Sequence, residues 1–269
     1  MTLNQKSGTY LLTRRRVVVG IGAAGVLPWV GAQVAVASQA VNTAGRQRML
    51  LARVTKTYCQ VGRGIDTANS QRLLHDSVAQ FDQALSRLRV AAPGTEIKET
   101  FNRLSTKWND YKDLVVGSAA VKERVKPVLD GADELLVLAN LGTLQLEQES
   151  GRATSKLTNV SGRQRMLTQQ LAAYGFARNW ALPAAQTQPI ISKRQLEYTQ
   201  AVAFLQGAKE NTVEIKGQFN EIGNMWIFFE TALTGSQTDR PKALDDLAVA
   251  SELILKGYDD LTGLYARLA

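Results

Sequence analysis

The stretch Asn42-Thr43-Ala44-Gly45-Arg46-Gln47-Arg48-Met49-Leu50 recurs 117 residues later as Asn159-Val160-Ser161-Gly162-Arg163-Gln164-Arg165-Met166-Leu167. We term these two stretches the arginine boxes. Weaker matches follow in the same order along the chain. Residues 81–85 match residues 198–202 at the same offset, and Trp108 matches Trp226 at an offset of 118. Matches that keep their order indicate the duplication of one structural unit.

Around the boxes, apolar residues recur at alternating steps of three and four, which places them on one face of a helix. One such stripe consists of Leu74, Val78, Phe81, Leu85 and Leu88. No segment shows apolar residues at every second position, so no sheet is predicted. The pattern predicts an all-α fold made of tandem up-down four-helix bundles that share one long central helix.

The long central helix is predicted because no strong helix breaker occurs between Ala119 and Trp180. It would contain about 60 residues and span roughly 90 Å at 1.5 Å per residue. Its two halves would be the last helix of a first unit, residues 38–153, and the first helix of a second unit, residues 154–269. After it, Pro183 and Pro189 predict a loop.

Residues 1–37 are predicted to be a twin-arginine-like export signal. Arg14, Arg15 and Arg16 precede an uncharged run that ends in Ala35-Val36-Ala37, a pattern typical of a cleaved leader. The predicted location is therefore the periplasm. An uncleaved N-terminal membrane anchor is the alternative, because an uncharged run of about 20 residues can span a bilayer. The leader carries four basic and no acidic residues, so its removal lowers the net charge from +8 to +4.

Composition excludes several classes of site in a chain of 269 residues. One cysteine, Cys59, and one histidine, His75, leave no disulfide framework and no Cys/His zinc site. No nucleophile–base pair or phosphate loop is visible. We therefore predict no catalytic residue, no metal and no cofactor, and the protein is not expected to be an enzyme. The mild charge after export gives no support to nucleic-acid binding.

The boxes concentrate arginines on one helix face. On a helix beginning near Gly45, Arg46, Met49 and Arg53 form one stripe, and Arg48 and Lys56 lie on an adjacent one. A planar oxyanion can satisfy guanidinium forks that are otherwise costly to bury. Ion pairs with acids elsewhere in the bundle, or exposure to solvent, would satisfy them as well. Identical Gly-Arg-Gln-Arg-Met-Leu in both copies favours a functional role.

The sequence Asn-x-x-Gly-Arg-Gln-Arg-Met-Leu resembles the N-terminal sensory domain of the NarX and PilJ families. These are nitrate/nitrite sensor kinases and type IV pilus methyl-accepting chemotaxis transducers. The resemblance implies a four-helix bundle that works as a dimer and holds an anion near the dimer axis. It maps the family's Arg-Met pair onto Arg48-Met49 and Arg165-Met166, and its anion-contacting arginine onto Arg53. The second copy departs from the nitrate pattern, because Gln170 occupies the position of Arg53.

The resulting hypothesis is an exported sensory protein that recognises a small oxyanion, nitrate or nitrite, across a homodimer or pseudo-dimer seam. Because no transducing domain is recognised in the chain, its signal is expected to pass through a membrane sensor or transducer protein. The predicted ligand-binding residues are Arg53, Arg46, Arg48, Gly45, Met49, Arg163, Arg165, Gly162 and Met166. The alternative is a non-ligand helical interaction module, accessory to a pilus or membrane sensor complex. Its box arginines would be buried against acids of the same chain.

Overall fold

The computed structural model describes residues 27–151, 153–236 and 241–268. In this part of the chain every regular element is a helix, which confirms the all-α prediction. A short 3₁₀ helix, η1 (Lys122–Arg124), precedes α4. The α-helices are α1 (Leu27–Arg63), α2 (Thr67–Ala91), α3 (Gly94–Val116), α4 (Val125–Ser150), α5 (Ala153–Trp180), α6 (Ala184–Gln206), α7 (Val213–Gly235) and α8 (Pro241–Arg267).

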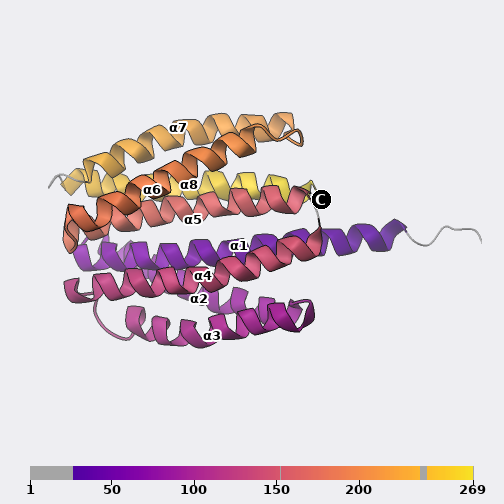
Figure 1. The fold of residues 1–269 in the computed structure, drawn as a ribbon. Coiled ribbons are helices and arrows are strands. Elements are labelled where there is room, and N and C mark those ends of the chain that lie inside the picture. Colours follow the sequence, from indigo (N-terminus) through magenta and orange to yellow (C-terminus); the bar gives the residue numbers. More distant parts are fainter. Residues whose placement is uncertain (1–26, 152, 237–240, 269) are drawn as a thin grey trace, which may run out of the picture.

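Helices α1 and α5 lie side by side and parallel in the middle of the molecule (Figure 1). Helices α2, α3 and α4 cover α1 on one side, and α6, α7 and α8 cover α5 on the other. We refer to α1–α4 as the first unit and to α5–α8 as the second unit. The α1–α5 contact is the most extensive between any two helices described. The arginine boxes, which lie on α1 and α5, are therefore at the centre.

The single long central helix is a wrong prediction. Helix α4 ends at Ser150, and Gly151 adopts a left-handed conformation with φ 62°. The Gly151 N–H donates to the carbonyl oxygens of Glu147 and Gln148, which closes the helix end as glycine C-caps do. The chain then reverses into α5, so each unit has its own four helices. The predicted loop at Pro189 is also wrong, because this proline lies inside α6.

The predicted apolar stripes form the core. The stripe from Leu74 to Leu88 on α2 is buried throughout, and the tilted rings of Phe81 and Trp108 pack with their centroids 4.0 Å apart. The indole N–H of Trp108 donates to Asp82 at 2.6 Å, which satisfies its one polar group. Helix α5 is buried on nearly all sides, because α1, α6 and α8 surround it. Its side chains must therefore find partners within the protein, polar ones included.

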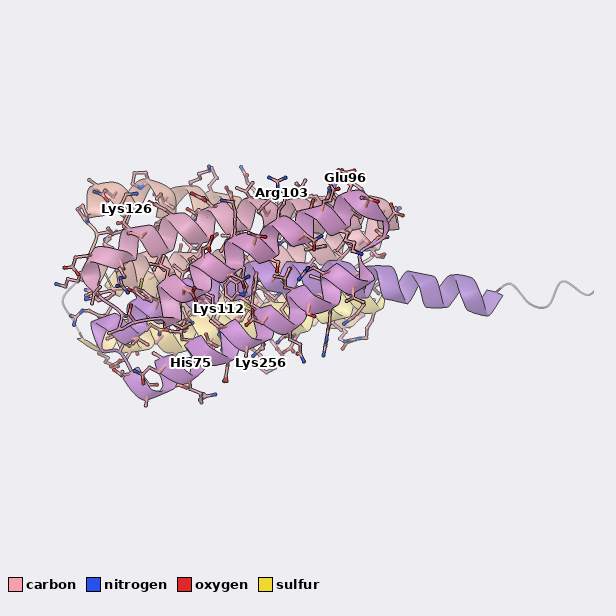
Figure 2. The ribbon with its side chains drawn as sticks, turned by 90° about the horizontal axis from the view of Figure 1, so that it is seen from below. His75, Glu96, Arg103, Lys112, Lys126 and Lys256 are labelled. Carbon is pink, nitrogen blue, oxygen red and sulfur yellow. The ribbon has the colours of Figure 1, made fainter. Side chains whose placement is uncertain are left out.

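Most of the predicted leader, residues 1–26, lies outside the described residues. Among the residues that are described, no helix has both the length and the apolar composition needed to span a membrane. Within the same ranges, no three His, Cys, Asp or Glu side chains gather in a way that could hold a metal ion. His75 is exposed on α2 (Figure 2). Burial of Cys59 raises the pKa of its thiol to about 12, so this thiol is not activated.

Candidate functional site

The packing of α1 on α5 brings the two boxes into reciprocal contact. Arg48 Nη2 donates to Asn159 Oδ1 at 2.6 Å, and Arg165 Nη2 donates to Asn42 Oδ1 at 2.9 Å. Asn42 and Asn159 are equivalent in the repeat, as are Arg48 and Arg165. Each unit thus gives the other the same contact, as the two halves of a two-fold symmetric dimer do. We term this α1–α5 interface the seam.

The box glycines provide space for these guanidinium groups. A Cβ atom at Gly45 would lie 3.4 Å from the Nη2 atoms of both Arg48 and Arg165. At Gly162 it would lie 3.0 Å from Arg165 Nη2, which is closer than most real contacts. Both glycines were predicted to contact a ligand. In the structure they adjoin the arginines, and a side chain at Gly162 would displace the guanidinium group of Arg165 slightly.

Arg48 is buried in the seam with neutral partners only. Its side chain is 1% exposed, and besides Asn159 it donates to Asn140 Oδ1 at 2.9 Å. No carboxylate of the described residues lies within ion-pair distance of it. Burial, and then the nearby charges of Arg163 and Arg165, lower the pKa of Arg48 to about 9. The charged form of this group is therefore held at an energetic cost.

Both arginines of the second box, in contrast to Arg48 of the first, have acidic partners. Arg165, also 1% exposed, donates to Asp259 Oδ1 at 2.5 Å. Burial lowers the pKa of Arg165, and Asp259 opposes that effect. Arg163 forms an ion pair with Glu197 of α6 at 3.1 Å. These pairs neutralise much of the second box from within the chain.

Arg53, the residue that the resemblance assigns to the anion, also has an acidic partner. Its guanidinium donates through Nε and Nη2 to the two carboxylate oxygens of Glu252 on α8. The fully buried Lys56 donates to the same carboxylate and to Ser251 Oγ at 3.0 Å. Burial alone would raise the pKa of Glu252, but the charges and hydrogen bonds of Lys56 and Arg53 outweigh it and lower this pKa to about 2. An anion that used Arg53 would have to compete with Glu252.

The equivalent place in the second unit is built differently. Gln170 replaces Arg53 and donates to Asp133 Oδ1 of α4 at 3.4 Å. Tyr174 donates to the other oxygen of Asp133 at 3.3 Å, and Arg194 of α6 forms an ion pair with it at 3.1 Å. Each of the helices α1 and α5 therefore has an acid of the opposite unit beside it, but the cations that pair with it come from α1 in the first case and from α6 in the second.

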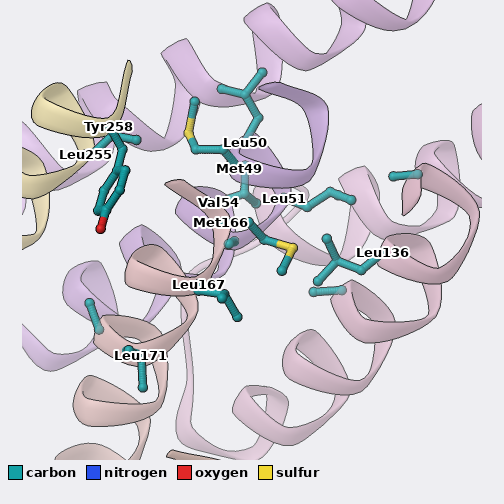
Figure 3. Packing of buried hydrophobic residues seen from close by; sticks show 14 of the residues in the cluster. Met49, Leu50, Leu51, Val54, Leu136, Met166, Leu167, Leu171, Leu255 and Tyr258 are labelled. Atoms are coloured by element: carbon teal, nitrogen blue, oxygen red, sulfur yellow. The ribbon is translucent and has the colours of Figure 1, made fainter. Parts of the chain in front are cut away.

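Met49 and Met166 belong to the apolar core (Figure 3). They are 2% and 5% exposed and lie among leucines, so neither presents its side chain to solvent or to an open site. Arg46 is the exposed member of the first box, with its Nη2 atom 3.4 Å from Gln80 Oε1. Sequence reasoning missed the acceptors of the seam, which are Asn42, Asn140, Asn159, Glu252 and Asp259. Only the two box asparagines carried a signal, because they are identical in both copies.

Comparison with known proteins gives a family match over the part of the chain that contains the first arginine box. Residues 29–132 match the family model of the type IV pili methyl-accepting chemotaxis transducer N-terminal domain, PilJ. This match confirms the resemblance over α1, α2, α3 and the beginning of α4, and it indicates a sensory, signalling role. No curated protein and no solved structure matches the chain.

Proposed function

We propose that this protein is a sensory-type signalling module whose two units are fastened by the arginine boxes into an intramolecular counterpart of a dimer. The observation that carries the proposal is the reciprocal pair of contacts between Arg48 and Asn159 and between Arg165 and Asn42. In this proposal the boxes are packing motifs, and a partner protein reads how α1 and α5 pack. This is the interaction-module alternative, and the pairing of Arg53 and Arg165 with acids of the same chain favours it.

The buried charge of Arg48 makes the free energy of the seam sensitive to how α1 packs on α5. Arg48 is buried without a carboxylate partner, and a buried charge in such surroundings costs free energy. A small shift of α1 against α5 would change that cost. A partner that prefers one packing over the other would therefore move the equilibrium between them.

The proposal also specifies a cellular location and a class of partner protein. The run Arg14-Arg15-Arg16 and the Ala35-Val36-Ala37 sequence support export to the periplasm. The family description, a chemotaxis transducer of type IV pili, supports a membrane sensor or transducer as the partner. The module would then dock on such a protein and modulate its signal.

Recognition of a small oxyanion such as nitrate or nitrite is the second candidate function. The observation that favours it is again Arg48, whose Nε atom has no hydrogen-bond acceptor among the described residues. No carboxylate there forms an ion pair with it, and Glu147 acts on its charge only from a greater distance. Arg163 and Arg165 lie near enough to lower its pKa. The anion would bind at Arg48, with Arg53 remaining on Glu252.

A double-mutant cycle tests the packing role of the boxes. Arg48→Ala, Asn159→Ala and the double variant are expected to show a coupling of about 1–3 kcal/mol in urea unfolding, because the two side chains are direct partners. Arg165 and Asn42 provide the matched cycle at the equivalent positions. Additive effects in both cycles would reject the reciprocal seam.

Calorimetric titration of the full chain with nitrate, nitrite and chloride separates the two functions. Saturable binding of nitrate or nitrite that is lost in Arg48→Gln supports the oxyanion site. Arg103→Gln serves as the control, because Arg103 is exposed on α3, far from the seam (Figure 2). The absence of binding, together with an intact coupling, supports the interaction module and rejects the oxyanion site.

A further inference from the structure

A surface hollow of about 520 Å³ lies between α1 and α2, beside the seam, with which it shares Asn42. On each helix its lining residues are spaced i, i+3, i+4 and i+7, from Gln39 to Arg46 on α1 and from Gln80 to Arg87 on α2. Positions with this spacing share one face of a helix. Two facing stripes of side chains therefore build the hollow.

The lining is polar and cationic. It contains two arginines, Arg46 and Arg87, and no acidic residue. The carboxylate nearest to Arg46 is that of Asp259, with 4.0 Å between the closest atoms, and Arg46 is half exposed. Arg87 is exposed and forms no ion pair with the described residues. The hollow thus offers two guanidinium groups whose charges are balanced weakly or not at all.

The two arginines lie toward opposite ends of the hollow. Helix α2 runs antiparallel to α1, and Arg46 contacts Gln80 at 3.4 Å. That contact places Arg87, at the other end of its stripe, near the level of Gln39. A stripe of seven residues rises about 10 Å along a helix. The amides of Asn42 and Gln83 occupy intermediate positions in the lining.

The same place in the second unit is filled by the protein itself. The residues equivalent to Arg46 and Gln80 are Arg163 and Glu197, which form an ion pair at 3.1 Å. Phe204 stands where the first unit has Arg87, and Lys156 Nζ lies over its ring, 5.2 Å from the centroid. The two units therefore share their boxes but differ here, where the cations of the first unit are paired weakly, as Arg46 is with Asp259, or, among the described residues, not at all, as for Arg87.

We propose that the α1–α2 hollow binds an extended organic dianion of the dicarboxylate class. One carboxylate would bind Arg46 and the other Arg87, because a guanidinium group donates two parallel hydrogen bonds to a carboxylate. A single nitrate ion could engage only one of two cations so far apart. The site goes beyond the proposed function. It uses neither Arg48 nor Asn159, so each proposal can fail while the other stands.

Binding of dicarboxylates of increasing length to the full chain tests the proposal. Succinate, glutarate and adipate are titrated by calorimetry, with acetate and nitrate as probes of single charge. At least one dicarboxylate is expected to bind about tenfold more tightly than acetate, because it gains a second charge-assisted contact. Arg87→Gln is expected to remove this advantage, whereas Arg103→Gln is expected to keep it.

Gln80→Glu is the sharper variant, because it gives Arg46 the partner that Arg163 has in the second unit. It is expected to weaken dicarboxylate binding about tenfold while the thermal midpoint stays the same or rises, since it adds an ion pair. A dicarboxylate that binds no better than acetate overturns the proposal. Binding that survives both Arg87→Gln and Gln80→Glu also overturns it.

Discussion

Three basic side chains in the middle of the molecule are fully buried, and each finds its counter-charge differently. Lys56 contacts Glu252 directly, and Arg165 contacts Asp259 directly. Arg48 has only the oxygen atoms of asparagines and a backbone carbonyl. A guanidinium group has five donors and can be satisfied by neutral oxygens, but its charge is then balanced only at a distance. Arg48 is therefore the group whose environment a partner or ligand would change most.

Glu252 makes folding stability depend on acid pH. Its pKa is lowered from 4.5 to about 2 in the folded protein. Because the folded pKa lies below the unfolded one, the stability that this carboxylate contributes is present above pH 4.5 and is lost as the pH falls to about 2. Glu252→Gln is expected to lower stability at neutral pH and to flatten its pH dependence in that window. Urea midpoints measured across the window by circular dichroism check this.

Glu134 supplies the control, because it is the repeat equivalent of Glu252 and forms an ion pair with Lys107 on the surface. Its side chain is 68% exposed, so solvent screens the pair. Glu134→Gln should keep the acid dependence of the parent chain. Equal pH profiles for the parent and Glu252→Gln would show that Glu252 does not carry this stability.

The sequence predicted which basic residues would lie together, but not which acidic residues would pair with them. The two boxes are recognisable because they repeat. Their partners are not, because Glu252 lies 199 residues from Arg53 and Asp259 lies 94 residues from Arg165. Asp259 carried no signal in the sequence, since helical positions alone do not say which neighbouring helix an acid faces. Only the packing of α8 on α5 brings it to Arg165 at the edge of the seam.

Among the helices, the break between α4 and α5 was missed for an identifiable reason. Several glycines lie in this stretch, and most of them stay helical. Gly142 is one of these. A Cβ atom there would lie 2.8 Å from the ring of Phe101, so close packing explains this glycine without a helix end. A glycine inside a helix costs only about 1 kcal/mol relative to alanine, so its presence does not mark an end. What distinguishes Gly151 is its left-handed backbone, which the sequence does not display.

Gly151→Ala is expected to destabilise the protein by about 1 kcal/mol, because alanine is strained at φ 62°. Gly223→Ala is the matched control. Gly223 lies inside α7, is exposed, and has open space around the position of a Cβ atom. That substitution is expected to stabilise by about 0.5–1 kcal/mol, because alanine is the better helix former. Urea unfolding of both variants measures the difference, and effects of the same sign would contradict the assigned roles.

For the whole molecule, the duplication accounts for the architecture. The repeat predicted two similar units, and the helical periodicity predicted their composition. Neither predicted that the first helix of each unit would pack on its counterpart, because a periodic stripe identifies a buried face but not the helix that buries it. The box residues that join the two units are Arg48 and Asn42 of the first and Arg165 and Asn159 of the second. The division into units at residue 153 remains a prediction.

This architecture predicts that the full chain is a monomer in solution. The surface that one unit would offer to a second copy is already covered, since Leu50 on α1 and Leu167 on α5 are both fully buried. The full chain should therefore show a mass near 29.4 kDa by light scattering, unchanged on about tenfold dilution. Leu141→Ser on α4 controls for association through an exposed apolar face, because Leu141 is 40% exposed. A dimer mass that survives this substitution would mean that the seam does not replace an intermolecular interface.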